Sequence, residues 1–151
     1  MSTIQNDSDF RAALAALTVP QQRLVAARFV ENVGTLTNDS RVKAAIHAAR
    51  RADISAPELE VVYSAAKTAA IESYTHCGQQ GDWMSQAGHF VAEAAATSVT
   101  PEPKAVNLAW DVAMRARMAR TCATIAEGQG TENREAEQQY RILADFLSNK
   151  G

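Results

Sequence analysis

Two pairs of histidine and glutamate residues could supply ligands for a transition metal. Glu72 is followed four residues later by His76, and His89 is followed four residues later by Glu93. Residues four apart share one face of a helix, and imidazole nitrogen and carboxylate oxygen atoms are common metal ligands. Such neighbours are also common as solvated helix pairs, and the Glu-x-x-His spacing of di-iron carboxylate bundles is absent here. A metal site formed by Glu72, His76, His89 and Glu93 is therefore the alternative interpretation of this chain.

Both cysteines could in principle act as nucleophiles beside a histidine. Cys77 and Cys122 would need His47, His76 or His89 as a base, but neither cysteine lies in a turn with an oxyanion-hole glycine pattern. Small buried thiols are ordinary in helical cores, so this is the expected state of both. The sequence therefore predicts a protein that is not an enzyme and that needs no cofactor.

The most basic stretch of the chain could bind a phosphate or an acidic partner. It contains Arg115, Arg117 and Arg120, of which the last two share a helix face, whereas Arg115 is spaced to pair with Asp111. The stretch has no interleaved aromatic residues of the kind that stack on nucleic-acid bases. A solvated face with local ion pairs is the favoured interpretation.

A second group of side chains could line a hydrophobic groove for a partner helix or an apolar ligand. Trp110, Met114 and Met118 recur at helical spacing, and Trp83 and Phe90 do the same on the preceding segment. Because this spacing is also that of a buried helix face, core packing is the stronger interpretation.

Caps and breakers divide the chain into the elements that must position these residues. Ser55-Ala56-Pro57-Glu58 combines a serine N-cap, a proline in the first turn and a glutamate at the third position, which predicts a helix to about residue 77, ended by Gly78. Asp82 is expected to cap the next helix, in which Gly88 marks a close helix crossing. Other helix starts are expected near residues 7–8, 18–20, 38–39, 101–103 and 131.

The composition favours helices throughout the chain. Alanine fills about a fifth of the 151 positions, Gly and Pro number 7 and 4, and no segment alternates apolar and polar residues. Connections between the expected helices are short, which favours antiparallel neighbours. We therefore expect an all-α fold, with residues 1–151 forming a single-domain antiparallel helical bundle or array of about six to seven helices.

The net charge and the hydropathy of the chain limit the kinds of molecule that it is expected to bind. A net charge of −2 gives no bias toward nucleic acid or anionic membranes, and no apolar run approaches the roughly 20 residues of a membrane span. The first nine residues do not form a basic and then apolar leader, so a cytoplasmic protein is expected. Small residues on several helix faces would let a second copy of the chain pack closely, so the sequence is also compatible with a homo-oligomer.

Three stretches of the chain resemble a diffuse group of bacterial alanine-rich, all-helical proteins of unassigned function, some of which are labelled as immunity proteins. The stretches are residues 23–28 with 39–41, 55–59 and 139–146. The resemblance implies a helical fold and a protein-binding role.

The leading hypothesis is therefore a non-enzymatic helical protein-interaction module, with an immunity or inhibitor-like role as its narrower form. The residues expected to be exposed partner contacts are Arg117, Arg120, Glu132, Glu135 and Glu137.

Overall fold

The structure is a computed structural model that describes residues 4–80, 82–101 and 107–149, with the side chains of all of these except 75–80. Within these ranges the chain forms seven α-helices, one short 3₁₀ turn and no strand, so the all-α prediction is confirmed. The elements are α1 (Asp7–Ala15), α2 (Val19–Asn32), η1 (Gly34–Leu36), α3 (Ser40–Ala49), α4 (Ala56–Gln80), α5 (Trp83–Ser98), α6 (Leu108–Ala126) and α7 (Glu135–Asn149).

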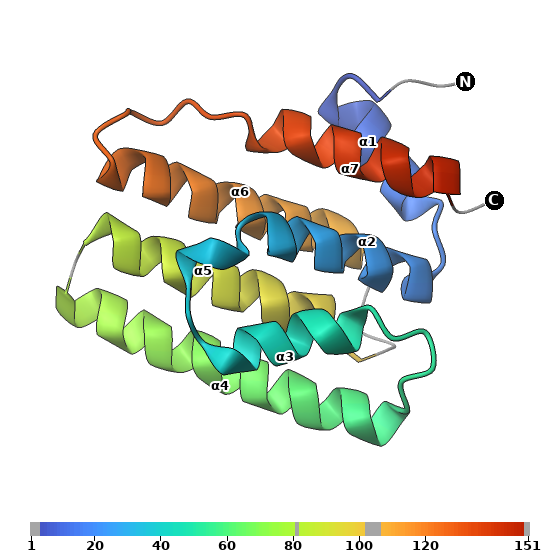
Figure 1. Ribbon diagram of the computed structural model, residues 1–151, viewed down its shortest axis with the longest axis horizontal. Coiled ribbons are helices and arrows are strands. Elements are labelled where there is room, and N and C mark those ends of the chain that lie inside the picture. The colour runs from blue at the N-terminus through green and yellow to red at the C-terminus, as the bar shows by residue number, and fades with distance from the viewer. Residues whose placement is uncertain (1–3, 81, 102–106, 150–151) are drawn as a thin grey trace.

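Helices α4, α5, α6 and α7 run up and down as antiparallel neighbours (Figure 1). The α5–α6 and α4–α5 pairs make the most extensive helix contacts, and α2 packs on α6. Helix α3 lies beside α4 at one edge of the array, whereas α1 and α7 cover the opposite edge. No helix in the described parts of the chain combines the length and the apolar character needed to cross a membrane.

Two predicted helix starts are confirmed in detail. The Ser55 hydroxyl accepts the Glu58 N–H at 3.2 Å, while the Glu58 carboxylate accepts the Ser55 N–H at 3.4 Å, which completes the capping box of α4. The Asp82 carboxylate accepts the Ser85 N–H at 2.7 Å and so caps α5. The start of α2 has a second capping box, formed by Thr18 and Gln21.

Several expected boundaries differ in the structure. Helix α4 continues past Gly78 to Gln80, because a glycine inside a helix costs only about 1 kcal/mol, which the packing of a long helix can offset. The cap of α1 is Asn6, not Asp7 or Ser8. Helix α7 begins at Glu135, whose N–H is bound by the Asn133 side chain, so Thr131 is not its cap. Helix α6 begins at Leu108 after its cap Asn107, and residues 102–106 of the expected start lie outside the described residues.

One hydrophobic cluster includes residues from all seven described helices. The large side chains Phe10, Phe29, Leu108 and Leu143 are fully buried in it. Alanines fill most of the remaining contacts on α5 and α6, so these two helices can approach closely along their length. A Cβ atom on Gly88 would lie 3.4 Å from the Leu36 carbonyl oxygen, so the segment that comes close to this glycine is the short 3₁₀ turn η1, where a helix crossing was expected.

Candidate functional site

An open groove with a volume of about 470 Å³ lies between α4 and α5, with α6 contributing to one side. The residues that line it are Tyr63, Lys67, Ala70, Ile71 and Tyr74 of α4, His89, Glu93, Ala96 and Thr97 of α5, Thr100 just after α5, and Arg115 of α6. The groove is therefore mixed in character, with aromatic, aliphatic and charged groups along the same surface.

The lining residues form two regular stripes. On α4 they fall at intervals of four, seven, eight and eleven residues from Tyr63, and the same intervals from His89 run along α5 and end at Thr100, just after it. These intervals are those of one face of a helix, and eleven residues at 1.5 Å each extend for roughly 16 Å. Two antiparallel helices thus present matching faces, about three turns long, to the same groove.

His89 is the most deeply placed polar side chain of the groove, with 7% of its surface exposed. Its Nδ1 atom lies 3.1 Å from the Ala70 carbonyl oxygen and 3.0 Å from the Ser73 hydroxyl oxygen. Its Nε2 atom lies 2.9 Å from Oε1 of Glu93, four residues further along α5. Contacts at both ring nitrogens fix the orientation of the imidazole, so His89 joins α4 to α5 at the floor of the groove.

Glu93 connects this histidine to the third helix. Its second carboxylate oxygen, Oε2, lies 3.6 Å from Nε of Arg115 on α6. The expectation that His89 and Glu93 share a face is confirmed by their contact.

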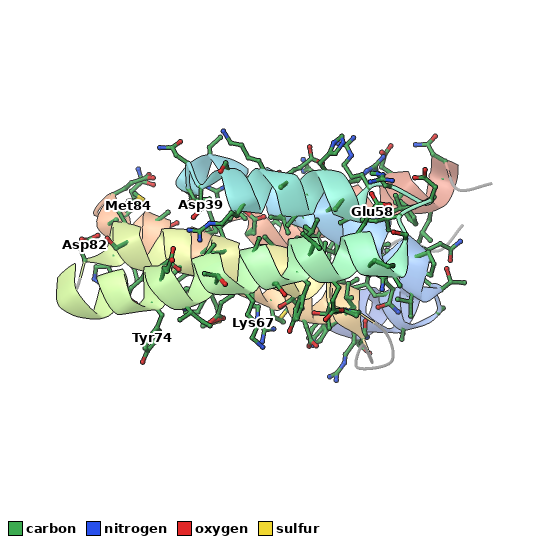
Figure 2. All side chains as sticks on the ribbon, turned by 90° about the horizontal axis from the view of Figure 1, so that it is seen from below. Asp39, Glu58, Lys67, Tyr74, Asp82 and Met84 are labelled. Carbon is green, nitrogen blue, oxygen red and sulfur yellow. The ribbon has the colours of Figure 1, made fainter. Side chains whose placement is uncertain are left out.

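The rim of the groove carries exposed apolar surface. Ile71 and Tyr74 are 60% and 69% exposed, which is high for side chains of this size. In Figure 2 the labelled side chains of Tyr74 and Lys67 project outward from the same side of α4. The Tyr74 ring also packs against the His89 imidazole, with the ring centroids 5.5 Å apart. The apolar rim and the polar floor therefore belong to one continuous surface.

Ser73, His89 and Glu93 stand in the order of a serine nucleophile, a base and an orienting acid, but their placement does not suit catalysis. Ser73 is not among the residues that line the groove, and its hydroxyl donates to the Ala70 carbonyl oxygen at 2.9 Å within α4. A nucleophile must be open to its substrate. The hydrogen bonds of Ser73 instead hold the imidazole in place.

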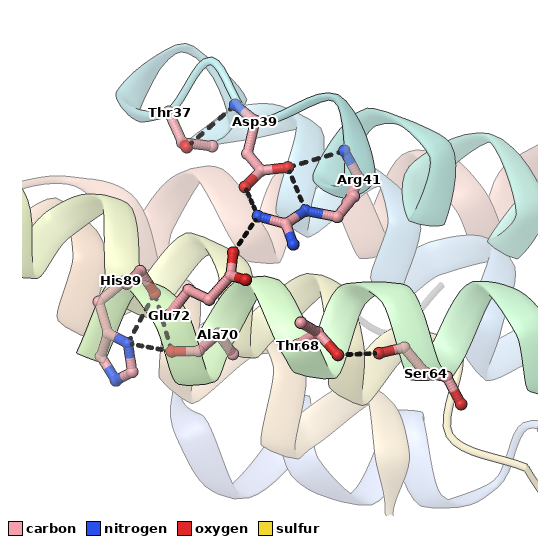
Figure 3. A network of polar contacts seen from close by, with 9 residues as sticks. Thr37, Asp39, Arg41, Ser64, Thr68, Ala70, Glu72 and His89 are labelled. Carbon is pink, nitrogen blue, oxygen red and sulfur yellow. Dashed lines mark hydrogen bonds and ion pairs between the residues drawn. The ribbon is translucent and has the colours of Figure 1, made fainter. Parts of the chain in front are cut away.

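Three of the four candidate metal ligands, Glu72, His89 and Glu93, have side chains that the structure describes, and these three do not come together. Glu72 turns away from His89 and binds Arg41 of α3, with 2.8 Å between its Oε1 and the guanidinium nitrogen (Figure 3). The side chain of His76 lies outside the described residues. In the described part of the chain, no group of three His, Cys, Asp or Glu side chains is placed to hold a metal ion. Of the expected set, the structure brings together His89 and Glu93.

The side chain of Arg117 is engaged inside the molecule. Its guanidinium donates to both carboxylate oxygens of Asp7, at 2.8 and 3.0 Å, and to the Gln139 side chain at 2.8 Å. It also stacks over the rings of Phe10 and Tyr140. The hydrogen bonds from Arg117 hold the pKa of the Asp7 carboxyl below its usual value. Arg117 thus ties α1 and α7 to α6.

Arg120 and Glu135 form a similar internal link. Their Nε and Oε1 atoms are 3.0 Å apart, and the Glu135 side chain is fully buried. The Asn32 side chain also donates to Glu135 at 2.7 Å. The expectation that Glu135 is an exposed contact is therefore wrong, because a buried carboxylate is stable when it is paired and hydrogen-bonded inside the fold. Glu132 and Glu137 are exposed as expected.

A second concave surface on α3 is lined by Lys43, Ile46, His47, Arg50 and Arg51. Its two arginines pair with acids of the same chain, Arg50 with Glu31 at 3.0 Å and Arg51 with Glu58 at 2.8 Å. These carboxylates neutralise much of the positive charge that would attract an anionic partner. The groove between α4 and α5 is therefore the stronger candidate site.

The hydrophobic groove that was the weaker interpretation of the tryptophan and methionine spacing does not form as one surface. Phe90, Trp110 and Met114 are partly buried and pack against the core, as the stronger interpretation predicted. Trp83 and Met118 are exposed, at 46% and 47%.

Fold and groove together define a class: an all-α array of antiparallel helices with an open, amphipathic groove between two of them. No family model, curated protein or solved structure matches this chain. The resemblance to immunity proteins therefore stays a prediction, and the groove is the feature that bears on function.

Proposed function

We propose that this chain is a non-enzymatic protein-interaction module that binds a helical segment of a partner protein in the groove between α4 and α5. The observation that carries the proposal is the pair of matching stripes, one on each helix, that line a groove roughly 16 Å long. An amphipathic helix that lies in such a groove inserts side chains at the same helical intervals.

The rim of the groove supports this occupant. Ile71 and Tyr74 leave large apolar surfaces exposed beside the stripe, and an apolar helix face would remove them from water. Tyrosine is also enriched where interfaces are energetically important, because a large rigid ring loses little entropy on binding. The groove floor is closed by His89 and by the alanines of both helices, so side chains of modest size fit above it.

A second copy of the chain is a less suitable occupant. Lys67 lies near the middle of the α4 stripe, so a two-fold axis through that stripe would place Lys67 beside its own copy. Like charges opposite one another destabilise an interface. A partner of different sequence does not meet this repulsion.

An immunity or inhibitor-like role is a narrower form of the proposal, and it requires the partner to lose activity when its helix is bound.

The metal-binding alternative has the contact between His89 and Glu93 in its favour. Elemental analysis of protein purified without a histidine tag separates the two proposals, since stoichiometric zinc or iron would favour the metal site.

The proposal is tested by affinity capture from the native host with three forms of the full chain. The groove variant is Ile71→Ala with Tyr74→Ala, and the matched control is Val61→Ala with Met118→Ala, which removes exposed apolar residues that do not line the groove. We expect one partner that is retained by the wild type and the control and lost by the groove variant. Equal retention by all three forms, or recovery of no partner, would overturn the proposal.

A further inference from the structure

The cations of the groove are only partly balanced by acidic groups. Lys67 contacts the Tyr63 hydroxyl at 3.3 Å and lies over the Tyr63 ring. Neither contact neutralises its charge, and no acidic side chain in the described parts of the chain forms an ion pair with it. The ammonium group of Lys67 is therefore held on the α4 wall by a neutral neighbour.

Arg115 brings a second cation to the opposite side of the groove. Its side chain is 38% exposed, and one guanidinium nitrogen donates to the Asp111 carbonyl oxygen at 3.2 Å. Its one carboxylate partner, among the residues that line the groove, is Glu93 at 3.6 Å, and Glu93 is also bound by His89. The Glu93 carboxylate thus contacts both His89 and Arg115, and it forms no ion pair with Lys67.

Among the described residues that line the groove, two cations, Lys67 and Arg115, stand against one carboxylate, Glu93, although the chain as a whole carries a net charge of −2. Arg50 and Arg51, which line the second concave surface, show the contrast, because each has a carboxylate of the same chain within 3.0 Å. Local excess charge of this kind steers and selects a partner of the opposite sign. The charge complement of the groove is an acidic surface.

We propose that the partner segment is an acidic amphipathic helix, with Asp or Glu side chains on both flanks of its apolar face. One flank pairs with Lys67 and the other with Arg115, while the apolar face covers Ile71 and Tyr74. This inference rests on the proposed function, and it adds the charge pattern by which the groove distinguishes its partner from other amphipathic helices.

The test uses three designed peptides of roughly 18 residues, long enough to exceed the three turns of the groove. All share one leucine and alanine face, and their flanks carry glutamate, glutamine or lysine. Circular dichroism is used to match their helicity, so that differences in folding do not enter the comparison. Binding of the fluorescein-labelled peptides to the full chain is measured by anisotropy at about 50 mM and about 500 mM salt.

We expect the glutamate peptide to bind about fivefold more tightly than the glutamine peptide, as two partly exposed ion pairs allow, and the lysine peptide to bind least well. The preference should shrink at high salt because the charges are screened. Lys67→Glu combined with Arg115→Glu should reverse the order. Lys43→Glu on α3, which makes the same kind of charge change outside the groove, should leave the order unchanged.

The outcomes separate this inference from the proposed function. If the three peptides bind equally well, and none of them binds the Ile71→Ala, Tyr74→Ala variant, the acidic preference is overturned. The proposal that the groove binds a helix then still stands. A preference for the lysine peptide would also overturn it. Binding of none of the three would overturn the inference and count against the proposed function, and binding that survives the groove variant would place the peptide elsewhere.

Discussion

Glu58 shows how one side chain can join two neighbouring elements. Its carboxylate closes the capping box of α4 through Ser55 and also accepts a hydrogen bond from Arg51, just after α3, at 2.8 Å. The hydrogen bond from Arg51 is the largest cause that lowers the pKa of Glu58 to about 2, and the hydrogen bonds from Ser55 add to it. The side chain is exposed, so the effect is local and is weakened by salt.

Replacing Arg51 with alanine is expected to raise the pKa of Glu58 toward its ordinary value of 4.5, while the Ser55 hydrogen bonds keep it below that value. Because the folded-state pKa is depressed, the stabilisation by this carboxylate is present above pH 4.5 and is lost as the pH falls toward 2. The measurement is a carboxyl carbon NMR titration of Glu58. Arg50→Ala, which breaks the pair with Glu31, is the control and should leave this titration unchanged. An unchanged pKa in Arg51→Ala would show that the Arg51 hydrogen bond is not its cause.

At the scale of the elements, local sequence patterns predicted helix starts better than helix neighbours. The caps at Ser55 and Asp82 were predictable because each side chain binds a backbone N–H three residues away. The contact between Arg117 and Asp7 was not, because these residues are 110 positions apart and no local period connects them. The same limit explains why Glu135 was expected at the surface.

The groove was also missed by the sequence analysis, and α4 shows why. Its buried residues Leu59, Ala66 and Ala69 form one apolar stripe, and the exposed residues Ile71 and Tyr74 add a second one beside it. A helix with such a wide apolar face is usually interpreted as a core helix. The second stripe is the signal that could have indicated an open binding face, but only the structure shows that no described element covers it.

Two glycine substitutions test how the elements are joined. Gly88→Ala is expected to stabilise the fold by about 0.5–1 kcal/mol, because alanine favours the helix and a small shift of η1 relieves the close contact of 3.4 Å between the new Cβ and the Leu36 carbonyl oxygen. Gly128→Ala has open space around it, yet it should destabilise the fold by about 1 kcal/mol because the backbone there has a φ of +76°. Urea unfolding of both variants gives the two signs. A destabilised Gly88→Ala would mean that η1 cannot shift by the few tenths of an ångström that the new methyl group needs.

For the molecule as a whole, the distribution of exposed apolar residues decides whether the chain associates with itself. Ile71 and Tyr74 lie at the groove, whereas Val61 and Met118 do not line it, and Trp83 lies at the start of α5. A stable interface between two proteins needs a contiguous surface of roughly 800 Å² on each partner. Outside the groove, the exposed apolar residues of the described chain are spread over several helices and do not form such a surface, and scattered residues of this kind are normal. In the groove, a second copy would place Lys67 beside its own counterpart.

We therefore expect the isolated chain to be monomeric, with a mass of 16.3 kDa by light scattering at both about 10 μM and about 200 μM, a range in which a weak dimer would begin to form. A dimer that disappears with Ile71→Ala and Tyr74→Ala would mean that a second copy covers the groove, against the repulsion expected at Lys67. A dimer that persists in that variant would use another surface and would leave the groove open in each copy.

The Ile71→Ala, Tyr74→Ala variant also tests the stability of the fold. Both side chains are largely exposed, so their loss should change the free energy of unfolding by no more than about 0.5 kcal/mol. If it unfolds markedly more easily than the wild type, Ile71 and Tyr74 contribute to the stability of α4, and the loss of a partner in the capture experiment would then reflect damage to the fold and not the removal of a binding surface.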